Sequence, residues 1–345
     1  MQEIIEQLRN QIDVYDKLIL HNILDRLELV KSIHKIKKKT SELIVDIDRE
    51  KQIVSSLISE IREIKTQNLI KSLYTLIFQE VKSISYPDSS SVSEALFSLL
   101  EKNQLVIAGP CAVENQEQIS GLAEAISALG VKFFRGGIYK ARTNPNSFQG
   151  LRENGLEMYY EAAKKFDLYT VSEFLDIEQA KSYFEFFDVI MIGSRNMSNF
   201  EFLAKIGKLT AENNKPVILK RGFASTVDEF LSAAEYITRE GNTHVILCLR
   251  GIRTYEEAQG FFRFPPDFHS LLEIRDKSDL KVIFDPSHSS GNSKIVPKVA
   301  KSAVDLGFNG IILEVHNNAE NALSDKNQQI SSDELGKIIE YLKTK

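Results

Sequence analysis

Four side chains that could together bind a divalent metal ion follow apolar runs in the last two-thirds of the chain. They are Cys111 after LVIAG, His288 after KVIFD, Glu314 at the end of GIILE, and Asp325 in the loop beyond. One thiolate, one imidazole and two carboxylates suit borderline ions such as Mn²⁺, Fe²⁺, Co²⁺ or Zn²⁺ better than Mg²⁺ or Ca²⁺. Taken alone, such a cysteine is usually a small buried hydrophobe and such an aspartate a turn residue. The metal site is therefore a prediction that depends on the fold bringing the four together.

Basic side chains follow the same apolar runs in unusual number. They are Arg135, Lys140, Arg142, Arg195, Lys220, Arg221 and Arg250. Most surface lysines and arginines are merely solvated, but so many at one place would repel one another unless anions bound there. The guanidinium fork suits phosphate and carboxylate, and lysine adds a point charge. We therefore expect small, multiply anionic substrates with at least one phosphate, beside a metal that polarises a carbonyl group.

Eight apolar runs provide the elements that would position these residues. They are LVIAG, VKFFRG, LYTVSE, DVIMIGSR, PVILKRG, HVILCLRG, KVIFDPSH and GIILEVH. Each is rich in β-branched or aromatic residues, is as long as a strand, and is bounded by polar residues or glycine. Amphipathic stretches long enough for a helix separate them, which predicts an α/β fold, a (β/α)₈ TIM barrel. Since the carboxyl ends of barrel strands meet at one mouth, the residues after the runs should share one site.

Glycine marks the domain boundary. The chain has 17 glycines, none of them before Gly109, and Pro87 is the only proline before that point. A barrel needs glycine at many turns, whereas a helical bundle does not. We expect an all-helical domain over residues 1–86, a linker over Ser85–Ser91 and the barrel over residues 92–345.

Three helices are expected in the first domain. Apolar residues over Ile5–Val30 recur at spacings of three and four, which predicts a long amphipathic helix that ends at the lysines 37–39. A second helix should cover residues 48–61 and extend slightly beyond, and a third should cover Asn68–Ile84. A long helix with a full apolar stripe needs a partner, so the pattern alone is also typical of a coiled-coil dimerisation arm.

Motifs along residues 100–345 resemble those of 3-deoxy-D-arabino-heptulosonate 7-phosphate (DAHP) synthases of the type I-beta branch. The strings are AGPCAVE, FFRGGIYKARTNPNSFQG, IGSRNM, LKRG, CLRGIRTYE, DPSHSSG, EVH and ALSD. The resemblance implies condensation of phosphoenolpyruvate with erythrose 4-phosphate to DAHP and phosphate. It assigns the metal, with Mn²⁺ first among the borderline ions, to Cys111, His288, Glu314 and Asp325. It assigns phosphoenolpyruvate to Arg135, Lys140, Ser194, Arg195, Lys220 and Arg250, and the phosphate of erythrose 4-phosphate to Arg142 and Thr143.

Roughly the first 85 residues resemble the all-helical class of chorismate mutase through LRNQID, Arg26, Lys37 and DIDRE. The resemblance implies rearrangement of chorismate to prephenate, with the ligand at Arg9, Arg26, Lys37, Asp46, Arg49 and Glu50. On one ideal helix Arg26 and Lys37 share a face and Arg9 points away from both. That fits the intertwined dimer of the family, in which the residue at Arg9 reaches the partner's site. The resemblance thus implies a homodimer through this domain, or a tetramer built on it.

Five positions depart from the family patterns. In the barrel they are Ala141, Ser194, Leu249 and Asn317, where the strings KPRT, GARN, CERG and EVHP are usual. None of them removes a metal ligand or a phosphate-binding cation, so we expect altered affinity or altered surroundings of the metal. In the helical domain Ser85 aligns with a glutamine that normally binds the ether oxygen of chorismate. We therefore expect ligand binding and feedback inhibition of the barrel from this domain, but slow mutase turnover.

Two other functions remain open. 3-Deoxy-D-manno-octulosonate 8-phosphate synthases perform the same aldol chemistry on arabinose 5-phosphate, but they carry a KANR-type string where this chain has KARTNP. A non-catalytic paralogue that binds aromatic-pathway metabolites is the second alternative, and the complete set of metal ligands argues against it for the barrel. For the helical domain, a purely regulatory or dimerising role stays open.

Composition narrows the range of partners. The 345-residue chain has 43% hydrophobic and 26% charged residues, a formal net charge of −5 and a pI near 5.8. These values are ordinary for a globular protein and give no general attraction to nucleic acid or anionic membranes. No apolar run is long enough to span a bilayer, the N-terminus is unlike a signal peptide, and Cys111 and Cys248 make no disulfide framework. We expect a cytoplasmic enzyme that acts on small anions.

Overall fold

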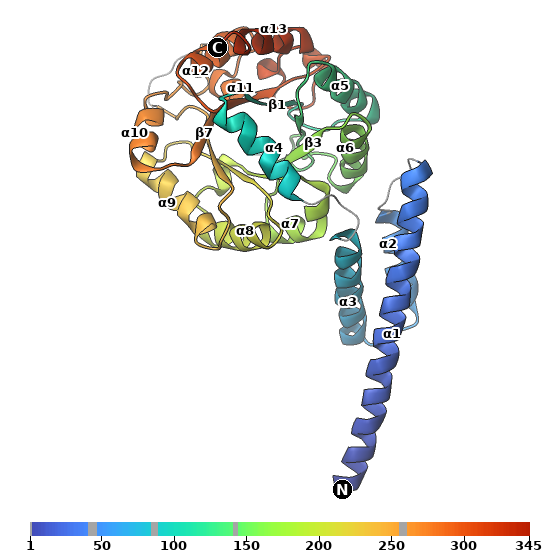
Figure 1. Ribbon diagram of the computed structural model, residues 1–345. Helices are drawn as coiled ribbons and strands as arrows, with labels where there is room; N and C mark the ends of the chain where they lie inside the picture. Colours follow the sequence, from blue (N-terminus) through green and yellow to red (C-terminus); the bar gives the residue numbers. More distant parts are fainter. Residues whose placement is uncertain (1, 41–46, 84–88, 141–143, 255–260) are drawn as a thin grey trace. The chain divides into compact units, whose positions relative to one another are not determined.

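The computed structural model describes residues 2–40, 47–83, 89–140, 144–254 and 261–345. The chain divides into two compact units, Met1–Pro87 and Asp88–Lys345. The first unit is helical, and the second is a closed barrel of parallel strands surrounded by helices (Figure 1). In the part of the chain that is described, no helix is long and apolar enough to cross a membrane.

The helical unit consists of α1 (Gln2–Thr40), α2 (Ile47–Ser59) and α3 (Ile64–Ser83). The three expected helices are present, but the second ends before Ile61 and the third begins one turn before Asn68. The side chain of Gln67 explains this difference. Its amide donates to the carbonyl oxygen of Ile61 at 2.7 Å and to that of Ile58 at 3.5 Å, and so closes the turn between the two helices.

The first half of the apolar stripe of α1 is exposed. Ile12 is 56% exposed, Tyr15 65% and Ile19 53%, whereas Ile23, Leu27 and Val30 farther along the helix are half-buried. An exposed apolar stripe over several helical turns is typical of a surface that another protein chain covers.

The eight apolar runs form eight parallel strands, which confirms the TIM barrel. The strands are β1 (Leu105–Gly109), β2 (Phe133–Arg135), β3 (Tyr169–Glu173), β4 (Val189–Ile192), β5 (Val217–Lys220), β6 (Val245–Leu249), β7 (Lys281–Phe284) and β8 (Gly310–Glu314). Each strand pairs with the next, and β8 closes on β1 through Leu105↔Gly310 to Gly109↔Glu314. This register places the end of β1 beside the end of β8, and with them Cys111 beside Glu314.

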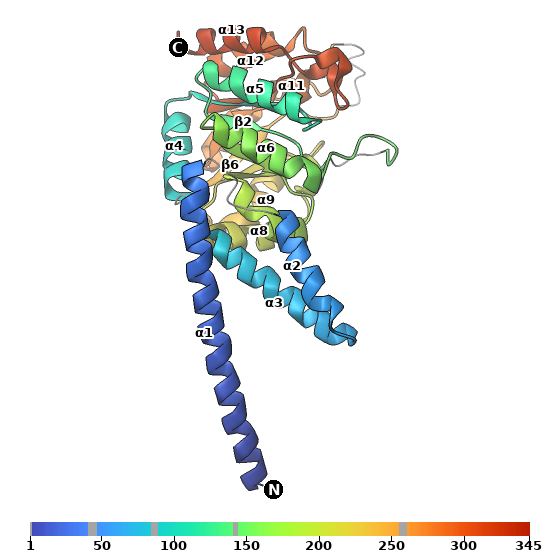
Figure 2. The same cartoon turned by 90° about the vertical axis from the view of Figure 1, so that its right-hand side faces the viewer.

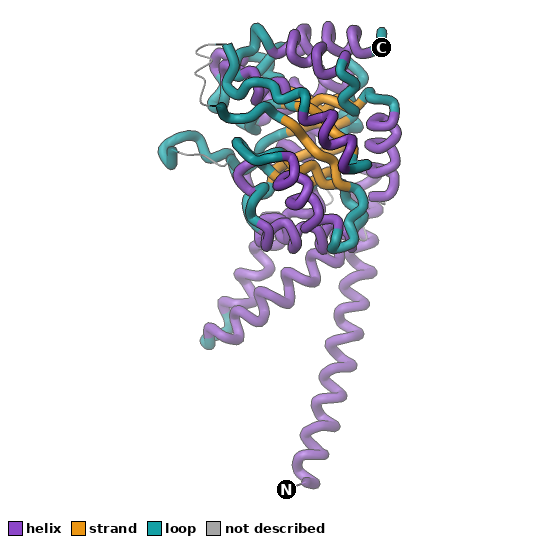
Figure 3. The backbone as a smooth tube through the Cα atoms, turned by 90° about the vertical axis from the view of Figure 1, so that its left-hand side faces the viewer, coloured by secondary structure: helices purple, strands orange, loops and turns teal. Residues whose placement is uncertain are grey.

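Helices lie outside the strands on all sides (Figures 1 and 3). They are α5 (Gln116–Ala128), α6 (Glu153–Lys165), α7 (Ile177–Tyr183), α8 (Phe200–Glu212), α9 (Val227–Thr238), α10 (Ser270–Lys277), α12 (Val296–Asp305) and α13 (Ser332–Leu342). A short helix, α11 (Pro286–Ser290), follows β7. Asp285 caps α11, because its carboxylate accepts from the backbone N–H of His288 at 3.0 Å.

A further helix, α4 (Ser89–Glu101), precedes β1 and lies across one end of the barrel (Figures 1 and 2). Val92, Leu96 and Leu100 are buried in the same cluster as Leu105 and other strand residues, so the helix seals the amino end of the barrel. The predicted linker over Ser85–Ser91 is therefore wrong in its last three residues. Serine favours the start of a helix as well as a loop, and the sequence pattern does not distinguish the two.

The three-residue strand β2 is joined to β3 partly by a side chain. The hydroxyl of Tyr159, from α6, donates to the carbonyl oxygen of Phe134 and accepts from the backbone N–H of Val171 at 2.9 Å. A hydroxyl thus completes the ladder between β2 and β3 directly beside Arg135. Gly136 leaves room for the ring, since a Cβ there would lie 2.6 Å from Tyr159 Cε2.

We predict that Tyr159→Phe lowers the free energy of unfolding by about 1–3 kcal/mol, because it leaves the buried groups of Phe134 and Val171 unpaired. Urea denaturation of the full-length protein measures the effect. Tyr169→Phe, in β3, is the matched control, since its hydroxyl makes no hydrogen bond in the described part of the chain and its removal should change little. Equal stabilities for the two variants would contradict the role of Tyr159.

Candidate functional site

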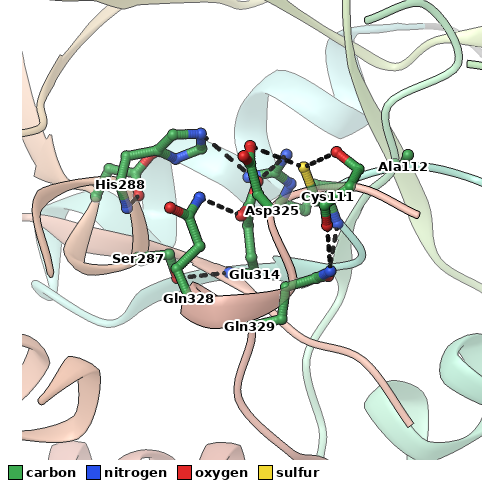
Figure 4. Close-up of polar contacts among 12 residues, drawn as sticks. Cys111, Ala112, Ser287, His288, Glu314, Asp325, Gln328 and Gln329 are labelled. Atoms are coloured by element: carbon green, nitrogen blue, oxygen red, sulfur yellow. Dashed lines mark hydrogen bonds and ion pairs between the residues drawn. The ribbon is translucent and has the colours of Figure 1, made fainter. Parts of the chain in front are cut away.

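The four expected metal ligands lie close together at the carboxyl end of the barrel (Figure 4). The ligand atoms of Cys111, Glu314 and Asp325 all lie within 4.8 Å of one another, and Cys111 Sγ is 3.4 Å from Asp325 Oδ2. His288 Nε2 lies 3.6 Å from Glu314 Oε1 on the side away from the sulfur. A thiol and two carboxylates from the ends of β1 and β8 therefore meet at one point, and an imidazole from the end of β7 lies beside one of the carboxylates.

Two adjacent glutamines hold this cluster in place, and no motif had singled them out. Gln328 Nε2 donates to Glu314 Oε2 at 2.6 Å, and Gln329 Oε1 accepts from the backbone N–H of Cys111 at 2.9 Å. Both follow Asp325, whose left-handed backbone (φ +43°) starts a 3₁₀ turn over Lys326–Gln328. The turn therefore fixes the Asp325 loop over β1 and β8. The only sequence signal is a pair of amides shortly after a predicted ligand.

Asp285 is a further residue to which the motifs assigned no role. Its carboxylate is fully buried and contacts Lys220 Nζ at 2.5 Å and His288 Nδ1 at 2.8 Å. With Nδ1 occupied by this contact, Nε2 is the nitrogen of His288 that faces Glu314. Asp285 therefore orients one predicted metal ligand and one predicted substrate cation at once.

Burial and neighbouring charges set the protonation of the cluster. Burial, and then the charge of Glu314, raises the pKa of the Cys111 thiol to about 12. Burial by itself would raise the pKa of Glu314 too, yet His288 and Arg135 together hold it below its usual range. Burial lowers the pKa of His288 although the charges of Asp285 and Glu314 oppose it, which favours the neutral imidazole that binds metals near pH 7, while the charged imidazole acts on Glu314 in acid.

Most of the predicted substrate cations surround this cluster. Arg135 Nη2 lies 3.1 Å from Glu314 Oε1, and Lys140 Nζ lies 3.2 Å from Cys111 Sγ. Arg250 is only 3% exposed and its Nη1 has no hydrogen-bond partner. At the end of β4, Arg195 is exposed and Ser194 half-buried. Arg142 and Thr143 lie outside the described residues, as does Ala141.

Arg221 differs from the other cations after the strands, because it binds another part of the protein and is not available for an anionic substrate. It is 4% exposed, forms a close ion pair with Asp267, and donates to the carbonyl oxygen of Ser225 through Nε and Nη2. Its side chain therefore holds the loop after β5 in place.

Two other positions that depart from the family strings lie in or after barrel strands. Leu249 is buried in β6, and Asn317 is exposed after β8.

A cavity of about 580 Å³ opens beside Lys140 in the connection between β2 and α6. Tyr139, Gln149, Arg152 and Gln179 are among the residues that line it. This volume is within the range of small-molecule sites, and its lining is polar and partly cationic. Lys140, one of its lining residues, precedes in the sequence the two residues expected to bind erythrose 4-phosphate.

Arg9 and Arg26, two of the predicted chorismate residues, lie far apart on α1. Arg26 lies with its guanidinium 5.2 Å from the ring centroid of Phe78, and its Nη1 is buried without a hydrogen bond. Arg9 pairs with Glu6, and along α1 it is about 25 Å from Arg26. The remaining predicted residues are Lys37, Arg49 and Glu50, which lie on α1 and α2, and Asp46, which is outside the described residues.

Comparison with known families covers both units. The model of the DAHP synthetase I family matches residues 100–345, and that of chorismate mutase type II matches residues 8–86. Phospho-2-dehydro-3-deoxyheptonate aldolase of Thermotoga maritima is 46% identical over 238 residues, which are 69% of this chain and 68% of that protein. 2-Dehydro-3-deoxyphosphooctonate aldolase of Helicobacter hepaticus is 28% identical over 270 residues, or 69% of this chain and 95% of that protein.

Solved structures of DAHP synthases are also similar to this chain. The crystal structure of the Thermotoga maritima phospho-2-dehydro-3-deoxyheptonate aldolase (DAHP synthase) superposes with a TM-score of 0.65 at 45% identity, over 70% of this chain and 68% of that one. A truncated form of 3-deoxy-D-arabino-heptulosonate 7-phosphate synthase from the same organism superposes with a TM-score of 0.61 at 42% identity, over 70% of this chain and 85% of that one.

We predict that Asp285→Asn lowers the free energy of unfolding by about 3–5 kcal/mol near pH 7, because Lys220 stays buried without its carboxylate. Although burial opposes it, His288 and Lys220 hold the pKa of Asp285 well below its usual range. A depressed carboxyl pKa stabilises the folded state above the unfolded pKa of about 3.9, and this contribution is lost as pH falls below it. The difference in the free energy of unfolding between the variant and wild type should therefore become smaller below about pH 4.

Urea denaturation across this pH range measures the gap. Asp305→Asn, at the exposed pair with Lys345, is the control and should stay close to wild type throughout. A gap that is absent at pH 7, or unchanged in acid, would contradict the buried ion pair.

Proposed function

This chain belongs to the DAHP synthetase I family, and we propose that its barrel condenses phosphoenolpyruvate with erythrose 4-phosphate to give DAHP and phosphate. With its chorismate mutase type II unit, it is an enzyme of aromatic biosynthesis with two functional domains. One observation supports the site assignment above all others. It is the meeting of a thiol, an imidazole and two carboxylates beside buried cations at one barrel mouth, from Cys111, His288, Glu314, Asp325, Arg135 and Lys220.

The residues at the mouth fit a borderline divalent ion. Glu314 Oε1 is buried without a hydrogen bond, and the neutral Nε2 of His288 lies 3.6 Å away. With the sulfur of Cys111 and a carboxylate of Asp325, the donor set is mixed S/N/O, which favours Mn²⁺, Fe²⁺, Co²⁺ or Zn²⁺, and Mn²⁺ is our first choice. When bound, such an ion supplies a Lewis acid that polarises the aldehyde of erythrose 4-phosphate.

The buried cations would bind phosphoenolpyruvate. Arg135, Lys220 and Arg250 are at most 5% exposed, so their attraction for phosphate and carboxylate is little screened by water. Lys140, Ser194 and Arg195 complete this site in our proposal, and Arg142 and Thr143 hold the phosphate of erythrose 4-phosphate. C3 of the enolpyruvate then attacks the aldehyde carbon, water adds at C2, and phosphate leaves. The acceleration comes from positioning and from charge stabilisation.

The helical unit would bind chorismate or prephenate between two protomers. The buried, unpaired Nη1 of Arg26 is available for a carboxylate of the ligand. Arg9 is too distant on the same helix to join it, so the partner's copy of Arg9 would complete the site. The exposed stripe of α1 supplies the surface for such a dimer. Mutase turnover would be slow, since the aligned position for the ether-oxygen donor is a serine, Ser85, outside the described residues.

We predict that the purified full-length protein consumes phosphoenolpyruvate with erythrose 4-phosphate at least about 100-fold faster than with arabinose 5-phosphate. A chelator should abolish the reaction, and Mn²⁺ should restore it. Cys111→Ser should need more metal for half-maximal rate, because a hydroxyl is a poorer ligand than a thiolate. Cys248→Ser, at the other buried cysteine, is the control and should keep the wild-type metal requirement. Full activity after exhaustive metal removal, or faster turnover of arabinose 5-phosphate, would overturn the proposal.

We predict that prephenate or chorismate inhibits condensation in the full-length protein and not in a truncated variant that starts at Asp88. The truncation keeps α4, which belongs to the barrel core. Inhibition requires that the ligand prefer one arrangement of the two units, and a coupling of about tenfold in apparent affinity is ordinary. Arg26→Ala should abolish the inhibition without changing the uninhibited rate. Equal sensitivity of the two proteins, or none in either, would contradict this regulation.

A further inference from the structure

Three arginines gather around one aromatic ring at the barrel mouth. The guanidinium carbons of Arg195, Arg250 and Arg253 lie 5.4, 5.0 and 5.3 Å from the ring centroid of Phe223. The first two follow β4 and β6, the third lies three residues beyond Arg250, and Phe223 is in the loop after β5. Because β5 lies between β4 and β6 in the barrel, the ring sits among cations from both of its neighbours.

These guanidinium groups carry like charges, and few nearby negative groups balance them. None of the three forms an ion pair with a carboxylate in the described part of the chain. Arg250 also carries a buried Nη1 without a hydrogen bond. Burial lowers the pKa of Arg250 to about 10, and the charges of Arg263 and Arg195 add to this effect against the opposing charge of Asp285. The three cations repel one another. Arg250 is attracted by Asp285 and by the ring of Phe264, 4.3 Å away, but Phe223 is the ring that all three share.

The ring of Phe223 is held independently of the arginine side chains. The ring stacks on that of Phe264, with centroids 5.6 Å apart. The backbone carbonyl oxygen of Phe223 accepts from the backbone N–H of Arg253 at 2.6 Å. Two residues earlier, Arg221 fastens the same loop through the carbonyl oxygen of Ser225. A fixed aromatic ring attracts each cation through its negative face.

We propose that Phe223 is a positioning residue that holds Arg195, Arg250 and Arg253 as a cradle for the phosphate group of an anionic substrate, with Arg253 as its third cation. Held in advance, the three forks lose less freedom when a phosphate binds, so affinity rises without any direct contact from the ring. The inference rests on the proposed function only in naming phosphoenolpyruvate as the natural source of that phosphate.

Calorimetric titration of the full-length protein with inorganic phosphate tests the cradle without any turnover. Phe223→Leu keeps an apolar side chain and removes the ring, and we expect it to weaken phosphate binding about tenfold. Phe223→Tyr keeps the ring and should stay within about twofold of wild type. Arg253→Ala should also weaken phosphate binding about tenfold. Adding Phe223→Leu to that variant should weaken phosphate binding by a smaller factor than it does in the wild type, since the two residues act together.

Phe166→Leu is the matched control, because Phe166 is also half-buried and lies 5.1 Å from a cation, Lys165, but at the end of α6 that precedes β3. It should bind phosphate like wild type. In turnover, Phe223→Leu should raise KM for phosphoenolpyruvate more than it lowers kcat. Wild-type phosphate affinity in Phe223→Leu, equal weakness in Phe223→Tyr, or equal weakness in Phe166→Leu would each overturn the inference. If the variants show the expected phosphate affinities but the protein does not catalyse the condensation, the proposed function is refuted and the cradle stands.

Discussion

The mouth of the barrel keeps two fully buried carboxylates, Glu314 and Asp285, in their charged form, and the arrangement of its cations follows from that constraint. A carboxylate does not stay ionised in a dry interior unless opposite charges and hydrogen bonds surround it. Arg135 and His288 lie against Glu314, while Lys220 and His288 lie against Asp285. These groups come from different strand ends, so only a closed barrel brings them together.

Some buried polar atoms at the mouth lack hydrogen-bond partners, and this supports the proposed ligand site. Glu314 Oε1, two nitrogens of Arg135 and one nitrogen of Arg250 are buried without hydrogen bonds. Buried polar groups are nearly always hydrogen-bonded in folded proteins, so the unpaired nitrogens of Arg135 and Arg250 support the proposal that an anion binds here. The aromatic ring of Phe223 provides attraction where no carboxylate is available, and so keeps the cations together before an anion binds.

Sequence patterns predicted the parts of this structure that local signals determine. Each strand carries its own apolar run, and three of the four predicted ligands lie at or just after the end of one, so the barrel and the convergence of Cys111 with Glu314 could be expected from the sequence. Helix α4 could not, because a serine run is equally common in a loop and at a helix start. The roles of Asp285, Gln328 and Arg221 could not either. Their partners lie far along the chain, and only the closed fold decides whether such a side chain faces a ligand or another part of the protein.

Anomalous diffraction from crystals of the full-length protein soaked with Mn²⁺ would test the central claim most directly. At the manganese absorption edge, the account predicts one strong peak in the barrel, bounded by Cys111 Sγ, a carboxylate oxygen of Glu314 and of Asp325, and His288 Nε2. The thiol should bind as thiolate, and His288 should keep its Nδ1 contact with Asp285. A saturating soak that gives no peak there, or a peak bounded by other residues, would contradict the account.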